Sequence, residues 1–93
     1  MPAEVSNVLD QIVKSGGEAP NGYRGGTTFT NDGRGGEPVL PKTDDHGNQV
    51  SYREYDVHPY HKGVNRGTDR IVRGSDGHAY YTSDHYRSFT RIE

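Results

Sequence analysis

The sequence predicts an α+β domain in which an N-terminal helix packs on a C-terminal antiparallel β-sheet. Three observations predict it: apolar residues recur at helical spacing near the N-terminus, glycine and proline crowd the middle, and the last part is rich in Tyr, Val, Ile, Phe and Thr. A helix followed by a run of strands is typical of this class. Since 93 residues are too few for two cores, we expect one domain over residues 1–93.

The expected helix occupies the start of the chain. Its apolar residues recur at a spacing that places them on one stripe of a helix, which can face a core. Lys14 falls in the expected last turn, and Gly16 and Gly17 follow as a stop signal. The stripe consists of Val5, Val8, Leu9, Ile12 and Val13.

Little regular structure is expected over residues 18–48, because Gly, Pro, Asn and Asp interrupt every apolar run. Residues 43–48 contain two Asp and one His, but they form a short polar turn with no second set of ligands at a matching spacing. We therefore expect a solvated loop there and no metal site. The few apolar residues of this region are interpreted as loop anchors: Tyr23, Phe29, Val39 and Leu40.

Four consecutive antiparallel strands are expected in the second half of the chain. Their residues are largely β-branched or aromatic, and glycine-containing turns such as residues 74–77 separate them. The strands are expected at residues 50–57, 69–73, 78–83 and 87–92.

Composition excludes several classes of function. The chain has 11 Lys+Arg and 13 Asp+Glu, so a globally basic nucleic-acid binder is excluded. Four of the five His lie after residue 50, so a local cationic site is still possible there. With no cysteine, a disulfide framework, a thiolate zinc site and a cysteine nucleophile are excluded. No apolar run reaches the length of a membrane span, and the N-terminus has no signal-peptide pattern.

Alternation along the first expected strand brings two carboxylates together. If Tyr55 and Val57 point into the core, Glu54 and Asp56 share the other face with Tyr52. Neighbouring carboxylates repel unless cations approach, and the next strand region offers Arg66 and Arg70, with Ile71 to anchor its core side. One interpretation is a surface ladder of weak ion pairs. The other is a functional site.

A polar and aromatic turn over residues 81–86 favours the functional interpretation. It contains His85, and histidine is the side chain best able to exchange a proton near neutral pH. Cleavage of RNA without a metal needs a base for the 2′-hydroxyl, an acid for the departing 5′-oxygen and cations around the phosphoryl group. Glu54, His85, Arg66 and Arg70 supply these parts. Ser83, Asp84 and His85 are not interpreted as a hydrolase triad, because triad members come from separate segments.

Three runs of sequence carry a resemblance to a known family. They are Tyr52-Arg53-Glu54-Tyr55, Asn65-Arg66-Gly67-Thr68-Asp69-Arg70-Ile71, and Tyr81-Thr82-Ser83-Asp84-His85-Tyr86 with Ser88-Phe89-Thr90. Together they resemble the microbial guanyl-specific ribonucleases, the group that includes barnase and the Streptomyces ribonucleases. The resemblance covers nearly the whole chain and implies the microbial ribonuclease fold.

The resemblance implies a role for each candidate residue. Glu54 falls on the general base and His85 on the general acid, while Asp56 falls on an acid that orients the arginines. Further, Arg66 and Arg70 fall on the phosphate-binding arginines, and Tyr86 on a tyrosine of the phosphate site. The remaining histidines at 58, 61 and 78 are expected to be exposed, with one or two of them near RNA phosphates.

Guanine recognition is expected in the loop between Phe29 and Pro41. By resemblance, Glu37 accepts hydrogen bonds from the guanine base, while Asn31 and the amides of Gly35 and Gly36 are further candidates. The segment 30–36 is longer than in the family, which puts the register of the backbone donors in doubt. The alternative is a flexible glycine loop without base contact. Tyr23 and Phe29 are expected to border the pocket.

The resulting hypothesis is a metal-independent endoribonuclease that needs no cofactor and cleaves single-stranded RNA after G through a 2′,3′-cyclic phosphate. One alternative is a toxin module of a larger bacterial protein, neutralised by an acidic inhibitor. Another is a relative that binds RNA without cleaving it. The resemblance implies a secreted enzyme or a delivered toxin domain. We further expect a monomer with no membrane partner.

Overall fold

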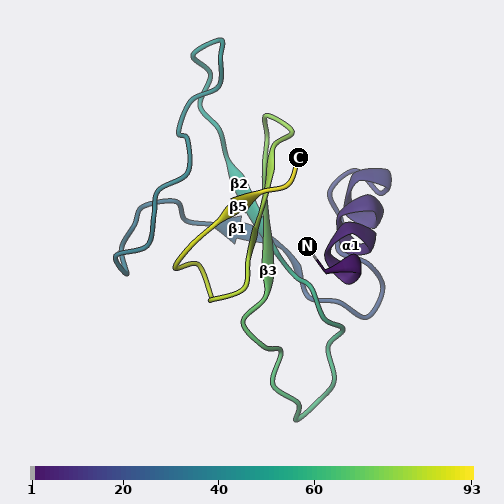
Figure 1. The fold of residues 1–93 in the computed structure, drawn as a ribbon. Coiled ribbons are helices and arrows are strands. Elements are labelled where there is room, and N and C mark those ends of the chain that lie inside the picture. Colours follow the sequence, from purple (N-terminus) through teal and green to yellow (C-terminus); the bar gives the residue numbers. More distant parts are fainter. Residues whose placement is uncertain (1) are drawn as a thin grey trace.

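The computed structural model describes residues 2–93, and Met1, the first residue of the expected domain, lies outside the described residues. Figure 1 shows one helix beside an antiparallel sheet, which confirms the expected α+β class. The elements in chain order are α1 (Ala3–Lys14), β1 (Gly25–Phe29), β2 (Tyr52–Asp56), β3 (Arg70–Gly74), β4 (Ala79–Thr82) and β5 (Thr90–Arg91).

Helix α1 ends where the sequence predicts. The amide of Gly16 donates to the Val13 carbonyl at 3.2 Å and that of Gly17 to the Ile12 carbonyl at 2.9 Å, and Gly16 has a φ of 78°. These bonds form a Schellman cap, in which glycine takes the left-handed conformation at no steric cost. Val13 departs from the prediction: it is 44% exposed, because it lies at the margin of a stripe whose buried members are Val5, Val8, Leu9 and Ile12.

The five strands lie side by side in chain order, and each pair is antiparallel. Strands β2, β3 and β4 occupy three of the expected segments. The last segment is mostly wrong: only Thr90–Arg91 form a strand, because the residues before them continue the turn that follows β4.

Strand β1 was not expected, because its residues are Gly25, Gly26, two Thr and Phe29. A Cβ built on Gly25 would lie 2.8 Å from the Cα of Tyr55, so the strand can pair here only through glycine. The glycines that signal a loop in the sequence therefore allow close pairing, with a bulge between Gly25 and Thr27.

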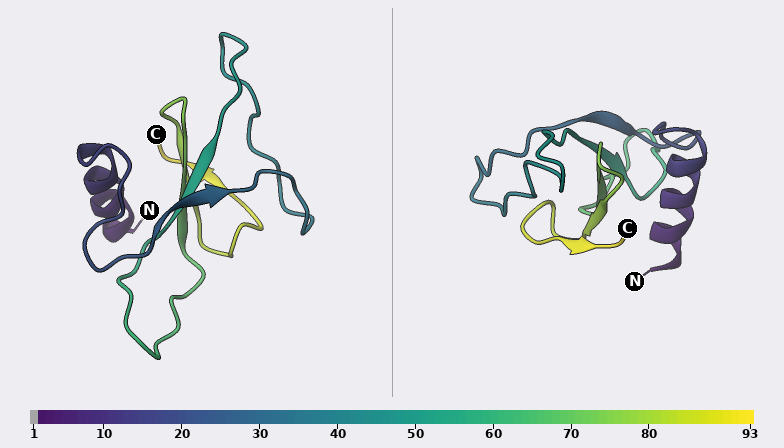
Figure 2. Two further views of the ribbon diagram at one scale, coloured as in Figure 1. Left: turned by 180° about the vertical axis from the view of Figure 1, so that it is seen from behind. Right: turned by 90° about the horizontal axis from the view of Figure 1, so that it is seen from above.

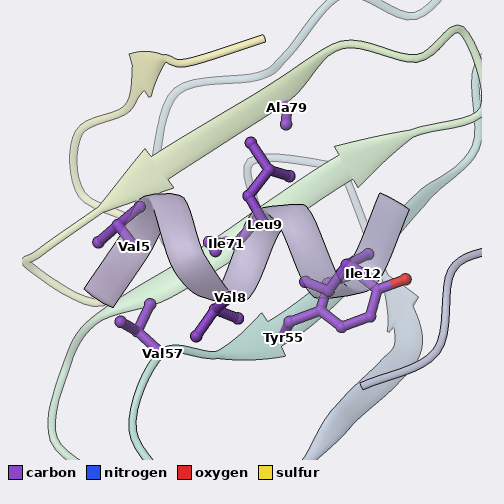
Figure 3. Close-up of a cluster of buried hydrophobic side chains, with 8 residues drawn as sticks. All are labelled: Val5, Val8, Leu9, Ile12, Tyr55, Val57, Ile71 and Ala79. Carbon is purple, nitrogen blue, oxygen red and sulfur yellow. The ribbon is translucent and has the colours of Figure 1, made fainter. Parts of the chain in front are cut away.

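The sheet has a hydrophobic cluster on each face. Against α1 lie Tyr55, Val57, Ile71 and Ala79, which contact the helix stripe (Figure 3). The other cluster contains Tyr52, and Figure 2 shows the sheet between α1 and the long loop that follows β1. The expected alternation along β2 is thus confirmed. The second cluster consists of Phe29, Leu40, Val50, Tyr52, Val72 and Tyr80.

Within residues 2–93, no helix has the length and apolar character needed to cross a membrane.

Candidate active site

Asp56 and Arg70 form a buried ion pair across β2 and β3. They are register partners in the sheet and are 4% and 5% exposed. Arg70 Nε lies 3.1 Å from Asp56 Oδ1, and Nη1 of the exposed Arg66 lies 3.3 Å from Asp56 Oδ2. Asp56 thus contacts both arginines. A purely surface ladder of ion pairs does not fit, because the central pair is desolvated.

Glu54 lies two residues before Asp56, on the same face of β2, and is half-buried. Among the described residues it has no ion-pair partner, since Asp56 takes both arginines. Its carboxylate, which no arginine pairs, is suited to accept a proton. We call the cavity beside it, about 350 Å³ in volume, the Glu54 cleft; it is lined by Tyr23, Arg24, Gly25, Thr27, Glu54, Asp56 and Arg66.

Tyr86 connects Glu54 to His85. Burial raises the pKa of the Tyr86 hydroxyl, and the charge of Glu54 and a hydrogen bond to it raise that pKa further, while Arg70 opposes the shift. The rings of His85 and Tyr86 lie 4.8 Å apart, and the His85 side chain is exposed. Tyr86 therefore lies close to Glu54 and Arg70, and His85 packs against Tyr86.

The turn that carries His85 and Tyr86 has a left-handed backbone at both residues, with φ of 55° and 75°. This conformation costs about 1–3 kcal/mol per non-glycine residue and persists only where the surroundings impose it. The buried Thr82 helps to impose this conformation. It is 1% exposed, and its Oγ1 accepts a hydrogen bond from the Tyr86 amide at 3.1 Å. The His85 amide donates to the Thr68 carbonyl at 3.1 Å, which ties the turn to the segment between the two arginines.

Asp84 closes the same turn. Its Oδ1 accepts from the Thr82 hydroxyl at 2.8 Å and from the Ser88 amide at 2.9 Å, and its Oδ2 accepts from the Ser88 hydroxyl at 2.6 Å. These hydrogen bonds, led by that from the Ser88 side chain, lower the pKa of Asp84 to about 2. The carboxylate stays ionised and keeps the turn closed through the whole pH range of ordinary enzyme assays.

This shift predicts how Asp84 affects stability. Because folding lowers its pKa from 3.8 to about 2, the ionised group stabilises the folded state above pH about 4, and this contribution is lost as pH falls toward 2. Asp84→Asn should therefore lower the melting temperature at neutral pH and differ progressively less from the parent below pH about 4. Thermal melts from pH 2 to 7 test this, with Asp45→Asn as the control; a constant difference at every pH would contradict it.

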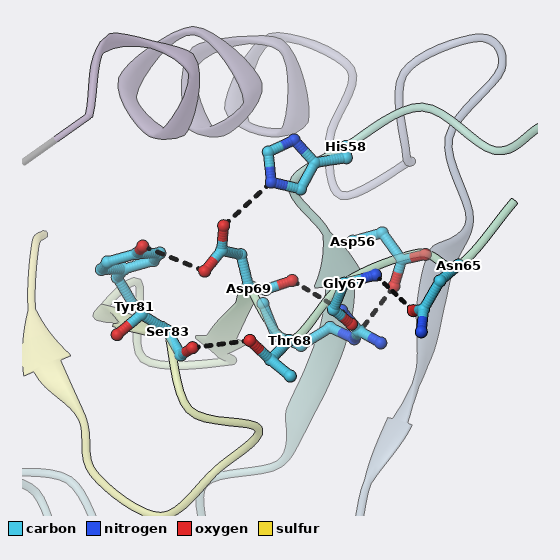
Figure 4. A network of polar contacts seen from close by, with 9 residues as sticks. Asp56, His58, Asn65, Gly67, Thr68, Asp69, Tyr81 and Ser83 are labelled. Carbon is cyan, nitrogen blue, oxygen red and sulfur yellow. Dashed lines mark hydrogen bonds and ion pairs between the residues drawn. The ribbon is translucent and has the colours of Figure 1, made fainter.

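A second network fixes the loop that carries Arg66 (Figure 4). His58 Nε2 lies 2.9 Å from Asp69 Oδ2, and the Tyr81 hydroxyl donates to Asp69 Oδ1 at 3.3 Å. His58 and Asp69 stand at the two ends of the loop, so their pair closes it. His58 was expected to be exposed or near an RNA phosphate, and the sequence contains no signal for its pairing with Asp69 because the partners are eleven positions apart.

In the expected guanine loop, two candidates have structural contacts. The Asn31 side chain donates to the Leu40 carbonyl at 2.8 Å and accepts from the Leu40 amide at 2.7 Å, which closes the loop. The amide of Gly36 donates to the Gly33 carbonyl at 2.9 Å. These two groups are therefore engaged within the loop.

The other loop candidates lie as follows. Glu37 is half-buried, and its carboxylate lies so close to Gly35 that a Cβ there would clash with Oε2. Phe29 is buried, with its ring centroid 5.1 Å from that of Tyr86. Phe29 therefore supports Tyr86 from within the second cluster, while Tyr23 lines the Glu54 cleft.

His46 and His78 lie away from this site. His78 contacts Arg91, at 2.7 Å from Nδ1 to Nη2, and His46 belongs to the turn closed by Asp44. No group of three or more His, Cys, Asp or Glu side chains suited to a metal ion occurs in the described part of the chain.

Comparisons with known proteins agree with the fold and show the family. A family model described as ribonuclease matches residues 1–93. The chain is 36% identical over 90 residues to guanyl-specific ribonuclease St of Saccharopolyspora erythraea, covering 96% of this chain and 77% of the relative. It is 29% identical to ribonuclease Sa2 crystallised with guanosine-2′-cyclophosphate, with a TM-score of 0.60 over 100% of this chain and 87% of that one. A structure of ribonuclease Sa2 in complexes with mononucleotides gives a TM-score of 0.61 at 29% identity, covering 100% of this chain and 85% of that one.

Proposed function

Because this chain belongs to the ribonuclease family and is similar to its guanyl-specific members, we propose that residues 1–93 form one endoribonuclease domain that cleaves single-stranded RNA on the 3′ side of guanosine. The observation that carries the proposal is that the two carboxylates of the site differ in their ion pairs. Asp56 holds both arginines, so Glu54 stays free as a base beside them.

The proposed reaction is a transesterification followed by hydrolysis. Glu54 takes the proton of the 2′-hydroxyl, whose oxygen attacks phosphorus, and His85 gives a proton to the departing 5′-oxygen. A 2′,3′-cyclic phosphate forms. In the second step the two residues exchange roles, and water opens the ring to a 3′-phosphate. Arg66 and Arg70 stabilise the charge on the phosphoryl oxygens through fixed guanidinium donors.

Guanine recognition is proposed for the loop 30–40, with Glu37 as the side chain that accepts hydrogen bonds from the base. Its partial burial beside Gly35 supports this role, because a carboxylate held in place loses less freedom on binding. We assign the Asn31 side chain to closing the loop and Phe29 to supporting Tyr86. Of the backbone donors first considered, the Gly35 amide stays a candidate.

The experiment that tests the proposal is incubation with an RNA that contains a single unpaired G, in excess EDTA, followed by mapping of the cut and its end group. A cut 3′ of G that ends in a 2′,3′-cyclic phosphate is the expected result. Cutting at every base would overturn the role of Glu37 and keep the catalytic assignment. A stoichiometric RNA complex without any cut would leave the RNA-binding alternative.

Two protonation requirements predict a bell-shaped dependence of kcat/KM on pH. Glu54 must be ionised and His85 must be protonated in the first step, so the rate should fall on both sides of an optimum. Steady-state rates on a dinucleoside substrate between pH 4 and 9 measure the profile. In His85→Asn the alkaline fall should disappear while the acid fall stays. A flat profile in the parent enzyme would exclude the Glu54 and His85 pair.

Capture by an acidic inhibitor, in a secreted enzyme or in a toxin domain, is the second candidate function. The exposed Arg66, which lines the Glu54 cleft, and the exposed His85 favour it, since acidic side chains of a partner can reach exposed cations. Poly-glutamate is a suitable probe. It should inhibit cleavage in low salt and lose this effect as ionic strength rises, and inhibition independent of salt would contradict the electrostatic basis.

A further inference from the structure

Two arginines face each other on the side of the sheet opposite the Glu54 cleft. Arg53 of β2 and Arg73 of β3 are register partners, and alternation puts them on the same face as Tyr55 and Ile71. A cavity of about 490 Å³ lies over them, which we call the arginine-pair cavity. It is bordered by the loop after α1 at Gly16, Gly17 and Glu18, by Gly25 and Gly26 of β1, and by Ser51 and Ser75.

Neither charge of the pair is matched. Within residues 2–93, no carboxylate lies within 4.0 Å of a nitrogen of Arg53 or Arg73, although Glu18 lines the same cavity. Arg53 donates to the Gly26 carbonyl, while Nε of Arg73 is inaccessible to solvent and has no hydrogen-bond partner. Like charges directly opposite each other on a sheet are destabilising, and a bound anion would relieve them.

The chemistry of the cavity fits a phosphate group. Guanidinium groups bind the oxygens of a phosphate through pairs of parallel hydrogen bonds, and two of them offer more donors than one carboxylate can accept. Five of the lining residues are glycines, so the absence of side chains leaves room for a polar group beside the arginines. The hydroxyl of Tyr55 donates to the Gly17 carbonyl and fixes the loop that forms the far wall.

We propose that the arginine-pair cavity binds a phosphate group, and that its source is a phosphodiester of the RNA strand whose scissile phosphate lies in the Glu54 cleft. Gly25 lines both cavities, and Glu54 and Arg53 are neighbours that point to opposite faces. The strand would cross the edge of the sheet at the bulge of Gly25 and Gly26, where side chains are absent. The choice of RNA as the source depends on the proposed function, whereas phosphate binding itself does not.

The first arm of the test is a titration of the ¹⁵N-labelled protein with inorganic phosphate, followed by amide shifts. We expect shifts at Gly17, Gly26 and Ser75 that saturate, and a separate set around Glu54. Arg73→Gln should weaken the first set by about tenfold or more and leave the second unchanged. Arg91→Gln removes the same charge from β5 and should change neither set. Absence of the first set, or its persistence in Arg73→Gln and Arg53→Gln, would overturn the site.

The second arm distinguishes the two sources of phosphate. A deoxyribonucleotide with one G cannot be cleaved by this chemistry, because it lacks the 2′-hydroxyl. A hexanucleotide should shift both sets and bind more weakly to Arg73→Gln, whereas a dinucleotide should shift only the amides around Glu54. Binding of inorganic phosphate to the cavity without any effect of the hexanucleotide there would overturn RNA as its source. Failure of the proposed function is visible separately, as absence of cleavage in the EDTA assay.

Discussion

Replacement of His85 by alanine is expected to lower kcat for RNA cleavage by about a hundredfold or more, the usual cost of losing a general acid or base. The fold should survive, because the turn is held by backbone groups, Thr82 and Asp84, and the exposed His85 side chain is not among the hydrogen bonds that close it.

The design of this experiment must allow for the left-handed backbone at position 85. Asparagine tolerates that conformation better than alanine does, so His85→Asn separates loss of the acid from backbone strain. Both variants should show the same loss of kcat on a dinucleoside substrate, with melting temperatures measured alongside. Arg87→Ala, two positions away, is the control and should retain activity. Parent activity in His85→Asn would remove His85 from the mechanism.

Loss of Asp56 is expected to have the largest effect on stability. In Asp56→Ala the buried guanidinium of Arg70 would lose its counter-charge, and breaking such a pair costs about 3–5 kcal/mol. Small domains have a free energy of unfolding of only about 5–15 kcal/mol, so the variant should be close to unfolding at 37 °C. Urea denaturation at pH 7 measures the change.

Arg66→Ala is the matched control for that experiment. It removes the other partner of Asp56, but Arg66 is exposed, and exposed ion pairs contribute about 0–1 kcal/mol. Loss of Arg66 should therefore have little effect on folding, because the charge on Asp56 is still matched by Arg70. Equal destabilisation by Asp56→Ala and Arg66→Ala would show that burial of the Arg70 pair is not the source of the effect.

Periodicity predicted the parts of the fold that depend on local pattern. The apolar stripe of α1 and the alternation along β2 can be predicted because buried positions repeat with a fixed period along each element. The same alternation put Glu54 and Asp56 on one face. Strand β1 was not predicted because it depends on a contact with Tyr55 of β2. Its glycines let the two strands approach closely, whereas in the sequence they indicate a turn.

The supports of the candidate site could not be predicted, because they depend on geometry between distant positions. Thr82 acts through a backbone amide four residues later, and Asp69 acts through His58 at the other end of the same loop. Such partners leave no periodic pattern. The division of labour between Glu54 and Asp56 was available only as an implication of the resemblance, since alternation treats the two carboxylates alike.

The order of strands in the sheet, identical to their order in the chain, bears on how the enzyme becomes active after synthesis. The β3–β4 hairpin closes over the short segment 75–78, whereas β2 joins β3 over 57–69 and β1 joins β2 over 30–51. The entropic cost of closing a loop rises with its length, so we expect the β3–β4 hairpin to form first and β2 to pair with β3 later. The Asp56–Arg70 pair spans that later junction. A nascent chain would therefore remain harmless to the RNA of its own cell until most of its tertiary structure is complete.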